Sequence, residues 1–171
     1  MAAMTAGATI GVCLALLTGW FDWRQRAVPN LLAYGVIAAG TLVGLLTGNL
    51  VANLPVAAIV FVVGLALFSG GRLGGADVKV MTGLALLMGQ PIFLHALGWA
   101  FACAAPISLL VLVSRQGLQT TIAWLYGSVV QVARGNLSAL NDGPHMPWLA
   151  FFAAGAVVAM TVAIVADASG P

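Results

Sequence analysis

Two short segments of the sequence each place an aspartate beside basic and turn-forming residues. The first is Asp22-Trp23-Arg24-Gln25-Arg26-Ala27-Val28-Pro29-Asn30, and the second is Gly74-Gly75-Ala76-Asp77-Val78-Lys79. Acids are scarce elsewhere, because the chain has no glutamate and its only other aspartates are Asp142 and Asp167. An acid at the edge of an apolar segment is costly and is often functional. Asp22 and Asp77 are therefore the first candidates for chemistry.

A pair of carboxylates can hydrolyse a peptide bond without a metal. Two carboxylates held close together cannot both ionise easily, so the pKa of one rises and the pair shares a proton. The ionised member acts as a general base on a water molecule, and the protonated member polarises the scissile carbonyl. We predict that Asp22 and Asp77 form such a pair and need no cofactor. We also expect no metal site, because Cys13 and Cys103 lie in separate apolar runs and form no C-x-x-C pair.

Both aspartates also have a purely structural interpretation. Asp22 could be a helix-end residue that pairs with Arg24 or Arg26. Asp77 could be the N-cap of the helix that follows it, a position where aspartate is favoured.

The neighbouring polar residues are open to two interpretations as well. Lys79 could contact substrate or tune Asp77, but we favour an anchor at the lipid headgroups, with its stem lying along the helix. Asn30 could hold the first loop through its amide or be a simple turn residue after Pro29.

The composition indicates that most of the surface faces lipid. Hydrophobic residues make up 62% of the 171-residue chain and charged residues only 6%, whereas a soluble domain carries about 25% charged residues. The net charge of +2 is too small to suggest a nucleic-acid partner.

The apolar runs predict an all-α, polytopic membrane protein with about six transmembrane helices, each needing about 20 apolar residues. We place the segments at Ala3–Trp20, Leu31–Thr47, Leu54–Phe68, Val78–Met88, Ile92–Val113 and Met146–Ala166. The fourth segment is short for a span. We expect residues 1–171 to form a single integral-membrane domain.

A further helix is predicted between the fifth and sixth spans, over residues 117–134. Its apolar residues recur at helical spacing on one face: Leu118, Ile122, Leu125, Val129 and Val132. This pattern is typical of a helix lying in the membrane interface. A seventh span is the alternative, but it would put Arg115 and Arg134 on opposite sides of the membrane.

The positions of the basic residues predict the orientation in the membrane. With six spans, all bases fall on one side: Arg24, Arg26, Arg72, Lys79, Arg115 and Arg134. Basic loops face the cytoplasm. We therefore expect Asp22 and Asp77 at the cytoplasmic face of a bacterial inner membrane and both termini outside.

The two segments resemble the motifs of the type IV prepilin peptidases, a family of membrane aspartic peptidases. Gly74-Gly75-Ala76-Asp77 is similar to the family's G-x-G-D motif, with Ala76 in place of the second glycine. The first segment resembles a D-x-R-x-x-x-I-P-N stretch, with Val28 in place of isoleucine. The resemblance implies that Asp22 and Asp77 are catalytic and that Gly74, Gly75, Ala76, Lys79, Arg26, Pro29 and Asn30 support them.

The resemblance also implies a substrate and a reaction. The expected partners are membrane lipid and a prepilin or pseudopilin with a basic leader and an apolar helix. The leader would be cut after a glycine at the cytoplasmic face. The cytoplasmic methyltransferase-type region of the longer family members has no counterpart here, so the chain looks closest to the short, peptidase-only Flp/Tad-type forms.

Two other functions are compatible with the composition. A small proton- or cation-coupled transporter or channel also carries acids in broken membrane helices, although usually near the midplane. A non-catalytic protein of a pilus or secretion assembly is the other alternative. A neighbouring reading frame that encodes a basic leader, a glycine and a long apolar helix would favour the peptidase.

Overall fold

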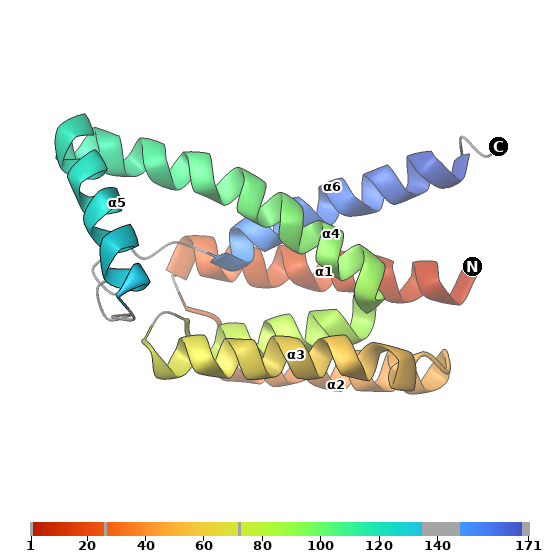
Figure 1. Ribbon diagram of the computed structural model, residues 1–171. Helices are drawn as coiled ribbons and strands as arrows, with labels where there is room; N and C mark the ends of the chain where they lie inside the picture. The colour runs from red at the N-terminus through yellow and green to blue at the C-terminus, as the bar shows by residue number, and fades with distance from the viewer. Residues whose placement is uncertain (1, 26, 72, 135–147, 169–171) are drawn as a thin grey trace.

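The computed structural model describes residues 2–25, 27–71, 73–134 and 148–168, and all regular structure in these ranges is α-helical. The helices are α1 (Ala2–Gln25), α2 (Asn30–Leu46), α3 (Leu50–Ser69), α4 (Gly75–Gln116), α5 (Leu118–Ala133) and α6 (Trp148–Ala168). Figure 1 shows α1, α2 and α3 running roughly along one direction, with α6 inclined to them and the later part of α4 crossing α6.

The helices are apolar enough to lie in a bilayer. Within the described ranges, α1, α3 and α4 are long and apolar enough to cross it, and α2 and the Leu149–Val165 part of α6 are shorter apolar segments. A membrane interior offers no water to unpaired backbone groups, so a chain of this composition satisfies them within helices. The protein is an all-α, polytopic membrane protein, as the sequence predicts, and the number of spans remains a prediction.

The predicted fourth and fifth segments form one long helix with a sharp break. Within the 42 residues of α4, Gly89 has φ 71° and ψ 168°, a backbone conformation that glycine tolerates best. Two residues later, Pro91 has no N–H to continue the helical hydrogen bonds. The Asn53 side-chain amide donates to the Leu86 carbonyl oxygen, just before the break, at 2.8 Å. Figure 1 shows the chain turning back at this point, so α4 has a first arm (residues 75–88) and a second arm (residues 90–116).

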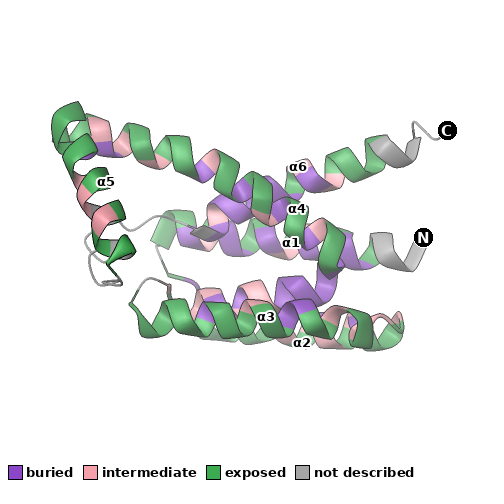
Figure 2. Ribbon diagram, in the orientation of Figure 1, coloured by how far each residue is buried: buried purple, intermediate pink, exposed green. Residues whose placement is uncertain are grey.

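The first arm lies at the centre of the protein. Figure 2 shows many buried positions along this arm, and Leu84 and Ala85 are completely buried. Small residues permit the close approach: a Cβ added at Gly40 of α2 would lie 2.6 Å from the Gly83 carbonyl oxygen. Glycine at such positions lets helix backbones pack tightly in a membrane. This packing fixes the start of α4 relative to α1 and α2.

The two ends of the bundle differ in charge. Helix α1 begins and α6 ends at one end, where the α2–α3 turn and the Gly89 bend also lie (Figure 1). The described basic residues, Arg24, Lys79, Arg115 and Arg134, lie on elements at the other end. Arg26 and Arg72 lie outside the described residues. The described bases are therefore gathered at one end, as the sequence predicts.

Helix α5 lies across the basic end of the bundle (Figure 1). Among the described helices it packs only against α4. Leu118, Ile122, Tyr126 and Val129 are exposed along it. This arrangement favours the interfacial helix predicted over residues 117–134, rather than a seventh span through the bundle.

Candidate active site

Asp22 lies inside the last turns of α1, because the helix runs five residues past its predicted end at Trp20 to Gln25. Its side chain is 8% exposed, and its Oδ2 accepts a hydrogen bond from the Leu149 N–H at 2.9 Å. The Ala150 N–H also donates to this carboxylate. The first N–H groups of a helix have no partner within the helix. Asp22 therefore caps the start of α6.

The predicted alternative role for Asp22 was an ion pair within its own segment. In the described part of the chain the carboxylate instead contacts the backbone of α6. Arg26, the other proposed partner, lies outside the described residues. The contact with Leu149 could not be read from the sequence, because any residue type supplies the same backbone N–H.

Asp77 lies in the first turn of α4, which begins at Gly75, three residues before the predicted start at Val78. The N-cap is Gly74 and not Asp77. The Asp77 Oδ2 accepts a hydrogen bond from the Gly74 N–H at 3.1 Å, which is half of a capping box. A Cβ added at Gly74 would lie 2.9 Å from this oxygen, so glycine gives the carboxylate its room.

Ala76 replaces the second glycine of the G-x-G-D motif without disturbing the backbone. Residue 76 is part of the regular α4 helix, so it has no need of the wider φ range of glycine. The Ala76 side chain is partly buried against the hydrophobic core. The departure from the motif therefore costs the local structure little.

The two aspartates open into one cavity of about 470 Å³ at the basic end of the bundle. It is formed by the end of α1, the α1–α2 connection, the start of α2 and the start of α4. Its lining residues are Asp22, Ala27, Val28, Asn30, Gly74, Gly75, Ala76, Asp77 and Lys79. The carboxylates are close enough that the charge of Asp22 acts on Asp77.

Lys79 and Asn30 connect the two sequence motifs across the rim of this cavity. The Lys79 Nζ donates to the Asn30 Oδ1 at 3.2 Å and lies 4.2 Å from the centroid of the Tyr34 ring. The headgroup-anchor interpretation that we favoured for Lys79 is therefore incomplete, because its ammonium group contacts α2. Asn30 is the first residue of α2, after Pro29 as N-cap, and is more than a turn residue.

The structure thus brings most of the predicted site residues together at one cavity. Asp22, Asn30, Gly74, Gly75, Ala76, Asp77 and Lys79 line the cavity, whereas Pro29 borders it through the N-cap of α2. Arg26 lies outside the described residues. Sequence reasoning missed Tyr34, Leu149 and Ala150; of these, Tyr34 alone carries a signal, one helical turn after Asn30 on the same helix. Across the described ranges, no three His, Cys, Asp or Glu side chains are grouped to hold a metal ion.

The fold and the cavity define a helical, polytopic membrane protein with two carboxylates lining one cavity at one end of its bundle. Residues 9–109 match the type IV leader peptidase family, and the chain belongs to this family. The matched region contains both aspartate segments and ends in the second arm of α4. Comparison with curated proteins gives no match, and neither does comparison with solved structures. The family makes the protein a peptidase and confirms the resemblance stated above.

Proposed function

We propose that this protein is a membrane aspartic endopeptidase that removes the leader peptide from prepilin-like substrates. The cut falls after a glycine, at the cytoplasmic face of a bacterial inner membrane. The observation that carries this proposal is the single cavity shared by Asp22 and Asp77 in a chain of the leader peptidase family. Residues 1–171 act as one peptidase unit without a methyltransferase region.

The surroundings of the two carboxylates support a division of their roles. Asp22 accepts two backbone N–H groups at the positive end of the α6 dipole, which favours its charged form relative to Asp77. Asp77 accepts one backbone N–H and lies in the field of Asp22, so it is the better candidate for the protonated member. Asp22 then acts as the base and Asp77 as the acid.

The two carboxylates can then supply and accept every proton that moves in the reaction. Asp22 takes a proton from water as the oxygen attacks the scissile carbonyl carbon, and Asp77 gives its proton to the carbonyl oxygen. In the second step Asp22 returns its proton to the amide nitrogen, the C–N bond breaks, and Asp77 recovers a proton from the hydroxyl group. Lys79 contacts Asn30 and Tyr34, and so holds the start of α2 against the start of α4 beside the pair.

The alternative functions gain no support from the site. The acids of a transporter tend to lie near the bilayer midplane, but Asp22 and Asp77 lie at the last turns of α1 and the first turn of α4. A purely structural assembly protein would need neither an open cavity nor a second carboxylate inside it.

Co-expression with a candidate prepilin tests the proposal. The wild-type protein should convert the prepilin into a faster-migrating band on a gel, and mass spectrometry of that band should place the new N-terminus directly after a glycine. A variant that carries both Asp22→Asn and Asp77→Asn is the control and should leave the prepilin intact. If the double variant processes the substrate like the wild type, the two aspartates are not the catalytic pair.

A further inference from the structure

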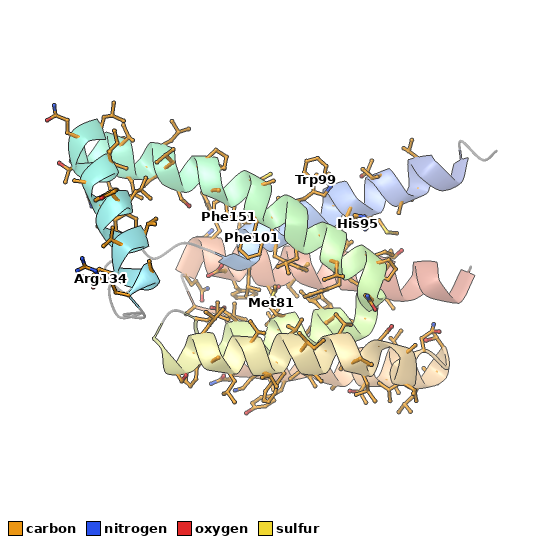
Figure 3. All side chains as sticks on the ribbon, in the orientation of Figure 1. Met81, His95, Trp99, Phe101, Arg134 and Phe151 are labelled. Carbon is orange, nitrogen blue, oxygen red and sulfur yellow. The ribbon has the colours of Figure 1, made fainter. Side chains whose placement is uncertain are left out.

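A second, apolar groove of about 620 Å³ runs along the bundle between α3 and the two arms of α4. One wall is a stripe on α3 that includes Val56, Val63 and Leu67. Phe93, Phe152 and Leu149 lie at its floor and are almost completely buried. Met81 and Phe101, labelled in Figure 3, also line it, from the first and second arms of α4.

The groove begins at the proposed catalytic pair. Asp77 lines both the polar cavity and the apolar groove, so the two spaces meet at its side chain. The groove extends to Gln90, next to the Gly89 bend, and Asp77 and Gln90 are the polar side chains of its lining. Its α3 wall, from Pro55 to Leu67, is about 18 Å long at 1.5 Å per residue. A carboxylate at one end of a long apolar trough fits a peptide that is polar at the reacting bond and apolar beyond it.

The geometry points to this groove as the binding site for the apolar helix of the substrate, with the scissile bond at Asp77. The inference rests on the proposed function, which supplies a substrate whose apolar helix begins at the cut. About 12 residues of that helix would lie along the α3 wall. The wall is open to lipid, because Ile59 and Val63 are 64% and 53% exposed. The substrate helix can therefore enter sideways from the bilayer without leaving it.

Two adjacent valines on α3 give a matched test. Val63 lines the groove, whereas Val62 is 64% exposed and points outside it. The photo-crosslinking residue p-benzoylphenylalanine is placed at either position in the full-length protein, which retains both aspartates. The probe is a model prepilin with a basic leader that ends in glycine and an apolar helix of about 20 residues. Illumination of the membranes should give a substrate adduct from position 63 and little or none from position 62.

Kinetics with the same probe give a second, independent measurement. Val63→Trp fills the groove and should raise the KM about tenfold, equivalent to about 1.4 kcal/mol of binding, with kcat little changed. Val62→Trp should leave both constants at their wild-type values. Both positions face lipid, so the added indole does not have to enter the core.

The outcomes separate this inference from the proposed function. Adduct at position 63 without any cleavage would support the groove and refute the peptidase. Cleavage with equal adducts at 62 and 63, with no adduct at either, or with unchanged kinetics in Val63→Trp would overturn the groove and leave the peptidase standing. An adduct at 63 to lipid alone, in the presence of cleaved probe, would also overturn it. A probe that is neither cut nor crosslinked would refute both.

Discussion

Each of the two aspartates has a structural contact beside its proposed catalytic role. Asp22 caps α6 through Leu149 and Ala150, and Asp77 accepts the Gly74 N–H at the start of α4. Asparagine keeps an acceptor oxygen for these contacts but cannot exchange a proton as a carboxyl group does. Alanine removes both functions, so comparing the two substitutions separates chemistry from structure.

Asp22→Asn and Asp77→Asn should each slow leader removal by at least about 100-fold, the usual contribution of a positioned acid or base. Protein level and membrane insertion should stay nearly normal. Asp22→Ala should be equally inactive but also less stable, by about 1 kcal/mol for a lost helix cap. Gel-shift rates and thermal unfolding in detergent measure the two effects. Cleavage near the wild-type rate in either asparagine variant would exclude that residue from catalysis.

A pair of reciprocal changes tests the G-x-G-D segment. Gly74→Ala should slow cleavage strongly, because the new methyl group would lie 2.9 Å from the Asp77 Oδ2 and push the carboxylate aside. Ala76→Gly should cleave at close to the wild-type rate, since residue 76 is helical and merely partly buried. It should lose up to about 1 kcal/mol of stability as a helical glycine. Equal rates in the two variants would argue against a steric role for Gly74.

At the scale of single residues, the sequence identified the candidate catalytic side chains but not the backbone groups that contact them. Asp22 and Asp77 could be chosen because acids are rare in the chain and both lie beside turn residues. The Leu149 N–H could not be identified from the sequence, because its role depends on where α6 begins and not on its residue type. Lys79 was assigned mainly to the headgroups, because a distant partner such as Asn30 cannot be read from local spacing.

At the scale of elements, apolar runs predicted the helices well and their ends less well. Helix α1 continues through Trp23 and Arg24 to Gln25, beyond the apolar run that predicted it. The break between the two arms of α4 was placed correctly near Gly89 and Pro91, since those residue types interrupt helices. The Asn53 contact that stabilises the break is tertiary and was not foreseen.

Gly89→Ala should destabilise the fold, and Gly98→Ala should not. Residue 89 has φ 71° and ψ 168°, a region nearly restricted to glycine, where a side chain costs about 1–3 kcal/mol, and its Cβ would lie 3.1 Å from the Asn53 Oδ1. Gly98 is on the second arm of the same helix, and a Cβ there meets no atom within 4 Å. Thermal unfolding in detergent should show a lower midpoint for Gly89→Ala alone. A midpoint equal to that of Gly98→Ala would mean that the bend does not need glycine.

At the scale of the whole molecule, the described bases and both carboxylates of the cavity lie at one end of the bundle. The composition predicted the lipid-facing surface, and the loop charges predicted which ends lie together. Neither could predict that the first arm of α4 would be the buried centre, because all the helices are apolar and burial depends on how small residues match across helices. The Gly40 and Gly83 contact is one such match.

The predicted orientation can be tested with single cysteines in a protein whose Cys13 and Cys103 are replaced by alanine. Asn49→Cys lies at the α2–α3 turn, Gln116→Cys at the end of α4 and Ala133→Cys at the end of α5. If basic loops face the cytoplasm, a membrane-impermeant maleimide should label residue 49 in intact spheroplasts. Residues 116 and 133 should react only after permeabilisation. The opposite pattern at 49 and 116 would place the carboxylates outside the cell and contradict cleavage at the cytoplasmic face. Because an α5 that crossed the membrane would separate residues 116 and 133, labelling of residues 49 and 133 but not of residue 116 in intact spheroplasts would show a seventh span.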